Sequence, residues 1–486
     1  MNIVKKTVLD ALAGVANDPK AKREALLFTI ASSFILVNSV ALSITTDGGV
    51  RWSHLYAPVV WFLLFLVAFF LLRHRHPDHD PYLLPLMGLL TGWGLLLVDR
   101  LAPGFLLRQV NWLVLGITAL IIVVYTPGDF NFLRRYRYTW LTLGILLLGA
   151  TFIFGVNPSG QGAALWLKVP FASRVFFQPS ELLKLLLVIF LASYFDERGR
   201  VIRLIPGKVW QRTLAYLGPL ALMGGFCVLM LVWQRDLGAA TLFLGLVLAM
   251  LYLATGDWIY VVGGIALLIL ASLVGYFIFD NIASWTESLL TQGTAGDSRI
   301  AQLVDSIGSV HDIITLRIDT WLNPWPEAST RGYQIIQSLY AVASGGLSGE
   351  GIAQGNPLFI PVVHSDFAFA AVAEEWGLIG ALVVIGCFAT IAYRGLRIAA
   401  ISLRSFGLFL ASGITIVFTF QAFLIMAGIT RLLPLTGITL PFVSYGGSSL
   451  LASSIMIGLL LNLSSQGVNS GRNRSESGKE VGPDET

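Results

Sequence analysis

Asp366 is the residue in this chain that is best placed to do acid–base chemistry. It stands in the run Val363-His364-Ser365-Asp366-Phe367, where a long polar segment gives way to an apolar one. Ionisable side chains near lipid are costly, which makes each of them a functional candidate. A carboxylate at such a boundary can reach both water and a lipid-anchored substrate, and can serve as a general base. The competing interpretation is a helix N-cap, because Asp favours that position and suits the helix dipole.

Two further pairs of ionisable residues fall inside apolar runs. Glu374 and Glu375 lie two turns after Asp366 on the same expected helix. They are either hydrogen-bonded structural groups or part of a substrate path. Glu181 and Lys184 are three residues apart, a spacing at which side chains meet on one helix face. For this second pair, an internal ion pair that braces the helices is favoured over contact with substrate.

Three segments between the apolar runs have compositions that suggest a local role. Asp236 is predicted to cap the helix that follows it, and Arg235 is left free to face an anionic headgroup. The glycine-rich run 345–351 lacks the Gly-Lys-Ser/Thr ending of a phosphate-binding P-loop and is expected to form tight turns. The segment 441–449 has the composition of a broken helix end at the membrane surface. Such a break survives only beside protein or a wet cavity.

The composition shows what kind of scaffold holds these residues. Of the 486 residues, 55% are hydrophobic and 12% are charged, about half the charged fraction of a soluble protein. So few charges cannot cover a soluble fold of this size, and the shortage predicts contact with lipid.

The net charge of +4 is spread over short loops, which argues against nucleic-acid binding. Cys227 and Cys387 lie in apolar runs and the six histidines lack metal-site spacing, which argues against a His/Cys metal centre.

Apolar runs long enough to cross a bilayer recur along the whole chain. A spanning helix needs about 20 mostly apolar residues, and a window of that length predicts an all-α integral membrane protein, a polytopic bundle of about twelve spans. The spans are expected near 25–43, 56–73, 82–98, 110–125, 138–156, 179–195, 213–233, 236–254, 257–279, 366–393, 405–427 and 445–463. The weakest of them is 82–98, which contains Pro85, Gly92 and Gly94.

The distribution of Lys and Arg predicts that both termini face the cytoplasm. With the N-terminus inside, basic residues concentrate in the connections on the inner side, as the positive-inside rule requires. The chain is therefore expected to be a multi-pass protein of the cytoplasmic (inner) membrane. Its predicted parts are a cytoplasmic N-terminus (1–24), two N-terminal spans (25–81), a core (82–465) with a large extracytoplasmic loop (280–365), and a disordered cytoplasmic tail (466–486).

Five motifs occur in a fixed order along the core. They are Phe177-Gln178-Pro179-Ser180-Glu181-Leu182-Leu183-Lys184, Arg235-Asp236-Leu237-Gly238, Gly332-Tyr333-Gln334, His364-Ser365-Asp366-Phe367 with Glu374-Glu375-Trp376-Gly377, and Leu440-Pro441-Phe442-Val443-Ser444-Tyr445-Gly446-Gly447-Ser448-Ser449. Together they resemble the SEDS family (shape, elongation, division and sporulation proteins) of the RodA, FtsW and SpoVE type. The resemblance implies a ten-helix core, preceded here by two additional helices. Ile425 and Arg431 depart from the usual residues at their positions, which concerns the subtype.

The resemblance implies a peptidoglycan glycosyltransferase that polymerises lipid II on the outer face of the cytoplasmic membrane, for cell elongation or division. The essential Asp of the family maps to Asp366, and such enzymes work with a class B penicillin-binding protein. The reaction needs a general base and cations for the leaving diphosphate. It leaves room for a divalent cation, Mg²⁺ or Mn²⁺, and needs no organic cofactor. Residues expected to contact the substrate are Lys168, Arg174, Arg235, Arg331, Gln334, His364, Ser365, Ser444 and Ser448.

Two other classes of function remain open. A transporter or flippase of the lipid-linked precursor would also have many spans and both termini inside. Carriers, however, tend to place their sites at the membrane midplane and to contain internal repeats, and no repeat is visible here. A non-catalytic scaffold for a penicillin-binding protein is the third class, and it would not need Asp366.

Overall fold

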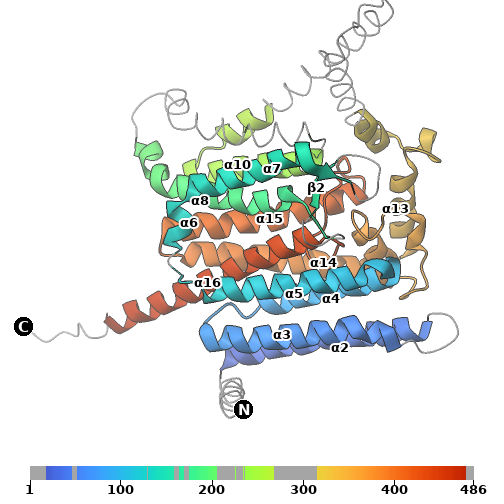
Figure 1. Cartoon of the computed structure of the whole chain (residues 1–486), viewed down its shortest axis with the longest axis horizontal. Helices are drawn as coiled ribbons and strands as arrows, with labels where there is room; N and C mark the ends of the chain where they lie inside the picture. The colour runs from blue at the N-terminus through green and yellow to red at the C-terminus, as the bar shows by residue number, and fades with distance from the viewer. Residues whose placement is uncertain are drawn as a thin grey trace, which may run out of the picture.

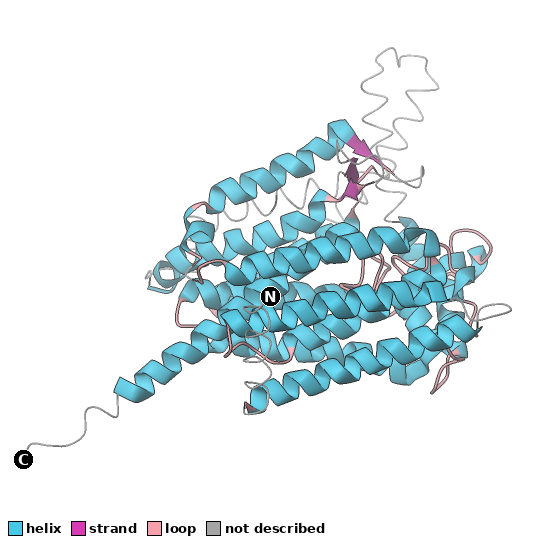
Figure 2. Ribbon diagram, turned by 60° about the horizontal axis from the view of Figure 1, so that its bottom comes forward, coloured by secondary structure: helices cyan, strands magenta, loops and turns pink. Residues whose placement is uncertain are grey.

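The structure is a computed structural model of the chain, and it describes residues 18–45, 52–128, 130–157, 164–168, 175–204, 225, 234, 236–266 and 315–477. Long helices dominate these residues and run side by side (Figure 1 and Figure 2). They are α2 (Pro19–Thr45), α3 (Tyr56–Arg75), α4 (Leu83–Leu101), α5 (Pro103–Tyr125), α7 (Arg137–Phe154), α8 (Pro179–Leu204), α10 (Leu237–Thr255), α14 (Ala368–Ile401), α15 (Ser405–Ile429) and α16 (Gly447–Ser477). The short elements are η1 (Trp52–Leu55), α6 (Asn131–Arg135), β1 (Gly155–Val156), β2 (Trp166–Lys168), β3 (Phe176–Phe177), η2 (Trp325–Glu327), α13 (Tyr333–Ser344) and η3 (Pro357–Phe359).

Ten of the twelve predicted spans coincide with these long helices. Within the described residues, nine of the helices are long and apolar enough to cross a membrane. The tenth, α8, has the length but carries Glu181, Lys184 and further charged residues toward its end. Almost all of the predicted span 213–233, and most of 257–279, lie outside the described residues. The chain thus forms the expected polytopic helical membrane protein.

The least apolar of the nine spans lies in the centre of the bundle. α4 has a mean hydropathy of only 1.3, yet 83% of it is buried inside the protein, whereas α7 is 22% buried. Its glycines allow this close packing, because a Cβ on Gly94 would lie 2.5 Å from the carbonyl oxygen of Phe442. Gly94, which weakened the prediction of this span, therefore lets α4 pack against the segment before α16, and Gly92 lets it pack against Ile35 of α2.

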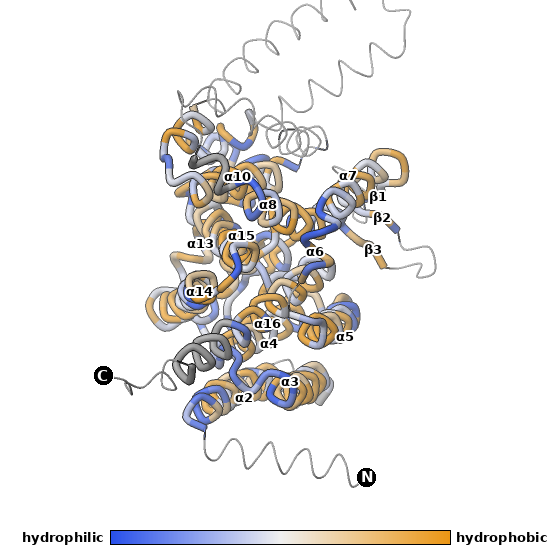
Figure 3. Tube along the Cα trace, turned by 90° about the vertical axis from the view of Figure 1, so that its left-hand side faces the viewer, coloured by the Kyte–Doolittle hydropathy of each residue, from blue (hydrophilic) through white to orange (hydrophobic). Residues whose placement is uncertain are grey.

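The helices α2 and α3 form a pair on one side of the bundle (Figure 3). Buried polar contacts hold this pair at both ends. At one end, Glu24 is fully buried and accepts a hydrogen bond from Arg73 at 2.9 Å, with His79 on its other oxygen at 2.9 Å. At the other end, the His54 ring lies 2.8 Å from the Asp99 carboxylate of α4. Removing one member of such a buried pair leaves an uncompensated charge, so these contacts tie the pair to the core.

The N-terminal pair also reaches α14. The indole Nε1 of Trp376 donates a hydrogen bond to Oδ1 of Asn38 at 3.0 Å. The Trp376 ring packs edge-on against Trp93 of α4, with ring centroids 5.3 Å apart. α2 is thereby joined directly to the helix that follows the Asp366 segment.

α14 is interrupted directly after Trp376. Gly377 has φ +66° and ψ −162°, a conformation that glycine alone adopts readily. The backbone groups freed by the break pair with the glycine-rich loop that follows α13. The Glu350 N–H donates to the Glu374 carbonyl at 2.9 Å, and the Leu378 N–H donates to the Gly346 carbonyl at 2.9 Å. The run that lacked a nucleotide-binding signature is therefore a packing loop against α14.

The two ends of the described bundle differ in character. α2 begins and α16 ends at one end, at the left in Figure 1, whereas α13 and its loops lie at the other end, here called the loop end. The strands form a small antiparallel sheet in the order β1-β2-β3, with Leu167 opposite Gly155 on one side and Phe177 on the other. α16 continues to Ser477, so helix extends into the tail for which disorder is predicted, and 478–486 lie outside the described residues.

Candidate active site

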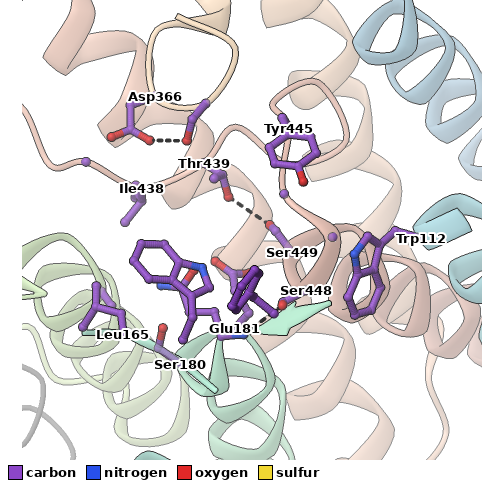
Figure 4. Close-up of a pocket in the computed structure, with 18 of the residues that line it drawn as sticks. Trp112, Leu165, Ser180, Glu181, Asp366, Ile438, Thr439, Tyr445, Ser448 and Ser449 are labelled. Atoms are coloured by element: carbon purple, nitrogen blue, oxygen red, sulfur yellow. Dashed lines mark hydrogen bonds between the residues drawn. The ribbon is translucent and has the colours of Figure 1, made fainter. Parts of the chain in front are cut away.

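A cavity of about 400 Å³ lies at the loop end of the bundle. Its walls come from the start of α5, the small sheet, the starts of α8 and α10, the segment before α14, and the segment between α15 and α16. Asp366 and Glu181 lie on opposite sides of this space (Figure 4). The cavity therefore brings together side chains that are far apart in the sequence.

Asp366 lines this cavity and does not cap a helix. α14 begins at Ala368, its N-cap position is Phe367, and no side-chain hydrogen bond caps it. The Asp366 carboxylate instead accepts a hydrogen bond from Ser365 Oγ at 2.7 Å, and the residue is half-buried. Burial raises the pKa of Asp366, while the Ser365 hydrogen bond and the charge of Arg317 partly offset that rise. A carboxyl whose pKa is raised is a stronger base than an ordinary Asp.

Arg317 is a cation of this site that sequence reasoning missed. It lies in the helical stretch 315–322 of the long loop, and its Nη1 donates to the carbonyl oxygens of Leu435 (3.2 Å) and Thr436 (2.9 Å). Gly437 follows with φ +70°. A Cβ on Gly437 would lie 3.4 Å from Arg317 Nη2 and 3.6 Å from Asp366 Oδ2. Both distances are ordinary van der Waals contacts, so it is the positive φ that favours glycine here. The guanidinium and the carboxylate thus both lie beside Gly437.

Glu181 and Lys184 form the other side of the cavity. Their side chains make an ion pair on α8, as the sequence favoured, and the Lys184 side chain is 2% exposed. Lys184 Nζ also donates to Oε1 of Gln421 at 3.0 Å. Gln421 in turn donates to the carbonyl of Thr439 at 2.7 Å. The pair braces α8 against α15 and at the same time presents charged groups to the cavity.

Asp236 caps α10, which confirms the sequence prediction. Its Oδ1 accepts from the Ala239 N–H at 3.0 Å and its Oδ2 from Ser180 Oγ at 3.5 Å. Burial raises the pKa of Asp236 to about 6, and the charge of Glu181 adds to the rise. Asp236 also lines the cavity, so a carboxyl with a raised pKa lies beside the Glu181–Lys184 pair.

An aromatic cluster forms the wall next to Asp366. The ring of Phe105 stacks on Tyr445, with centroids 4.9 Å apart, and lies 5.3 Å from the ring of His364. The Tyr445 N–H donates to the His364 carbonyl at 2.7 Å. Burial lowers the pKa of His364, so its imidazole is neutral at pH 7. The cluster holds the His364–Asp366 segment against the starts of α5 and α16.

The serines predicted to contact substrate fall into two groups. Ser365 and Ser448 line the cavity, and Ser448 Oγ also accepts the Gln178 N–H at 2.9 Å. Ser444 is buried, and its Oγ accepts the Leu440 N–H at 3.0 Å. Ser444 therefore holds the turn that precedes α16.

Other residues predicted to contact substrate lie away from the cavity. Lys168 is exposed at the end of β2, Arg331 is exposed on the loop before α13, and Gln334 is half-buried on α13. None of these three lines the cavity. Arg174 and Arg235 lie outside the described residues.

Glu374 and Glu375 are buried beneath the glycine-rich loop and do not line the cavity. Glu374 Oε1 accepts the Asn356 N–H at 2.7 Å. Arg100 Nε lies 3.5 Å from Glu375 Oε1, and Arg100 Nη2 donates to the Gly355 carbonyl at 3.4 Å. These contacts favour the structural interpretation, in which the carboxylates hold the loop on α14.

The amino-acid sequence of this chain is similar to one described protein family and to individual proteins with names. The model of a family described as "Cell cycle protein", covering FtsW, RodA and SpoVE, matches residues 97–469. Peptidoglycan glycosyltransferase RodA of Mycobacterium tuberculosis is 32% identical over 455 residues, which cover 91% of this chain and 90% of the relative. A probable peptidoglycan glycosyltransferase FtsW of Geobacter sulfurreducens is 33% identical over 367 residues, which cover 74% of this chain and 86% of the relative.

Solved structures share the fold. One, described as "Structural coordination of polymerization and crosslinking by a peptidoglycan synthase complex", matches with a TM-score of 0.61 and 25% identity, over 80% of this chain and 98% of that chain. The Rod shape determining protein RodA of Thermus thermophilus matches with a TM-score of 0.51 and 23% identity, over 79% and 96%. The second likeness concerns the fold alone.

Proposed function

The chain belongs to the FtsW, RodA and SpoVE family of cell cycle proteins, and on this premise we propose that it polymerises lipid II with Asp366 as the general base. It is a peptidoglycan glycosyltransferase, the activity that its RodA and FtsW relatives are named for. One observation carries the assignment of Asp366. Its carboxylate is half-buried on the cavity wall and caps no helix. Among the described residues, Ser365 alone donates a side-chain hydrogen bond to it.

The proposed reaction is a displacement at an anomeric carbon. Asp366 takes the proton of an acceptor sugar hydroxyl, and the hydroxyl oxygen forms a bond to the anomeric carbon of the donor. The bond from that carbon to the lipid diphosphate breaks, and the diphosphate leaves with the electron pair. Because diphosphate is already a good leaving group, one carboxylate suffices, and the acid–base pair of glycosidases is not needed.

Fixed cations balance the charges of this reaction. Arg317 lies close to Asp366 and lowers its pKa, which keeps the carboxylate available as a base near neutral pH. Lys184 is held on the opposite side of the cavity by Glu181 and Gln421. Charges fixed in a cavity with little water act more strongly than charges in solution and need no rearrangement during the reaction.

A divalent cation would fit at Asp366 together with substrate. The described residues contain no group of three or more His, Cys, Asp or Glu side chains that could hold a metal. Mg²⁺ is often bound by one or two carboxylates and the oxygens of a substrate phosphate, and this cavity offers such a carboxylate. Asp366 would hold the ion, which would neutralise charge on the diphosphate.

We place the cavity on the outer face of the cytoplasmic membrane, with both termini in the cytoplasm. Helices carry arginines near the end of the bundle where α2 begins and α16 ends. They are Arg73, Arg134, Arg137 and Arg394, each paired with an acidic residue. The positive-inside rule assigns that end to the cytoplasm. Asp366, at the opposite end, then faces the compartment in which the cell wall is built.

The proposed partner is a class B penicillin-binding protein, which would crosslink the new strands. A solved structure of similar fold is described as a peptidoglycan synthase complex that coordinates polymerization with crosslinking. The site described here provides chemistry for the first of these two reactions. Relatives named RodA and FtsW support a role in cell elongation or in division.

The test is reconstitution of the full chain, with its partner, in vesicles that contain labelled lipid II. We expect glycan strands from the wild type and none from Asp366→Ala. Equal strands from both would refute the role of Asp366 and favour a scaffold for another polymerase. Movement of lipid II across the vesicle membrane, without strands from either protein, would identify a flippase instead.

A further inference from the structure

We propose that Arg108 and the face of α5 below it bind the diphosphate and the first isoprene units of the lipid carrier that leaves in the reaction, an assignment that rests on the proposed function. The α5 residues Phe105, Arg108, Trp112 and Leu115 all line the cavity. Their spacings of three, four and three residues place them on one face of the helix. The cavity therefore has one wall that consists of a single helix stripe.

Arg108 is an uncompensated cation on this wall. Among the described residues that line the cavity, the one other Lys or Arg is Lys184, which forms an ion pair with Glu181. No carboxylate of the described residues lies within 4.0 Å of a nitrogen of Arg108. Arg108 is half-buried, lies over the Phe105 ring at 5.3 Å, and has its charge near the Tyr445 side chain. A guanidinium presents a planar fork of donors that matches phosphate oxygens. The wall is thus prepared for an anionic group.

The same face becomes apolar toward the middle of the membrane. Leu115 lies seven residues beyond Arg108, which is about 10 Å along a helix, and Trp112 lies between them. The Leu115 side chain is 53% exposed although it lines the cavity, so the cavity meets the lipid-facing surface there. Leu165 and Phe176 of the sheet region provide apolar side chains to the same cavity. A charged group followed by about 10 Å of apolar wall matches a diphosphate joined to an isoprenoid chain.

The position of Arg108 favours the leaving carrier over the incoming one. Arg108 stands over Phe105, and the Phe105 ring lies 5.3 Å from the ring of His364, two residues from Asp366. Negative charge develops on the bridging oxygen as the bond to the diphosphate breaks. A guanidinium beside that oxygen stabilises the transition state more than the ground state. Loss of Arg108 should therefore lower kcat and not only raise KM.

A binding experiment on the full chain in nanodiscs tests the site directly. The probes are undecaprenyl diphosphate and undecaprenol, which differ only in the diphosphate. We expect Arg108→Ala to weaken binding of undecaprenyl diphosphate about 10- to 100-fold and to leave binding of undecaprenol unchanged. Arg108→Lys, which keeps the charge without the fork, should fall between the two. The matched control is Arg397→Ala, at the far end of α14, which should bind both probes as the wild type does.

The outcomes separate this assignment from the proposed function. Binding of undecaprenyl diphosphate by Arg108→Ala and Arg108→Lys within twofold of the wild type would overturn the site, even if lipid II is polymerised normally. A higher KM for lipid II with unchanged kcat would assign Arg108 to the acceptor and overturn the choice of the leaving carrier. A wild type that binds the diphosphate through Arg108 but makes no strands would instead refute the proposed function. Undecaprenol binding in each variant reports whether the cavity is folded.

Discussion

Replacing Lys184 by Met should destabilise the protein by about 3–5 kcal/mol, because it leaves a buried carboxylate without its counter-charge. The Lys184 side chain is 2% exposed and that of Glu181 is 11% exposed, so water cannot take over the role of the missing partner. Gln421 would lose a hydrogen bond from Lys184 at the same time. The nearby carboxyl of Asp236 adds repulsion to the unpaired Glu181.

The magnitude of the pairing follows from a double-mutant cycle. Glu181→Gln should also be strongly destabilising, because it leaves the ammonium of Lys184 buried and unpaired. The double variant Glu181→Gln with Lys184→Met contains neither charge and should be less destabilised than the sum of the two single changes. We expect a coupling energy of about 2–3 kcal/mol, at the upper end for residues in contact.

Equilibrium unfolding of the purified protein in mixed micelles measures each corner of the cycle. The matched control is the exposed ion pair of Arg331 and Glu327, whose side chains are 65% and 50% exposed. Changing Arg331 to Met and Glu327 to Gln should give a coupling energy of at most about 0.5 kcal/mol. Single changes at Glu181 and Lys184 that are additive and each below about 0.5 kcal/mol would refute the reasoning that this pair is a buried brace.

Three further predictions test other parts of the structure. Burial raises the pKa of Asp366 above 3.8, and a protonated carboxyl cannot accept a proton, so kcat should fall as the pH drops through the raised pKa. Initial rates of strand synthesis across pH measure this, and a kcat that stays constant at low pH contradicts it. Gly94→Ala should lower the free energy of unfolding by about 1–3 kcal/mol, because the new Cβ would lie 2.5 Å from the Phe442 carbonyl oxygen. Unfolding by denaturant measures this change, and an unchanged midpoint contradicts the prediction. Asn38→Leu should lower the free energy of unfolding by about 0.5–1.5 kcal/mol, because it removes the acceptor of the Trp376 hydrogen bond. Unfolding by denaturant measures this. If Asn38→Leu destabilises a Trp376→Phe variant by the same amount, the hydrogen bond is not the cause.

Sequence alone is sufficient to predict the helical membrane fold, and it singles out Asp366, which the structure places on the cavity wall. The apolar runs have the length that a bilayer requires, so ten spans coincide with described helices. Asp366 stands at a boundary between polar and apolar segments and inside a recognisable motif. The spacing of Glu181 and Lys184 predicts their ion pair, because residues three apart meet on any helix whatever its surroundings.

The remaining cations of the site depend on packing that a single sequence does not reveal. Arg317 reaches Asp366 only because the stretch 315–322 folds back onto the segment before α16. Arg108 lines the cavity because α5 presents one particular face to it. Lys168 lies on β2 and Arg331 in the loop before α13, and neither lines the cavity. A basic residue in a loop therefore predicts a charge on that side of the membrane, and its distance from the acid is set by the tertiary fold.

The most direct test of the central claim is the initial rate at which Asp366→Asn makes glycan strands from lipid II. Asn has nearly the same shape as Asp but cannot take the proton of the acceptor hydroxyl. We predict a fall in kcat of at least about 100-fold, with unfolding unchanged, while Glu374→Gln, whose side chain lies off the cavity, keeps most of the rate. Strands formed by Asp366→Asn at the rate of the wild type would contradict the claim that this carboxylate is the base.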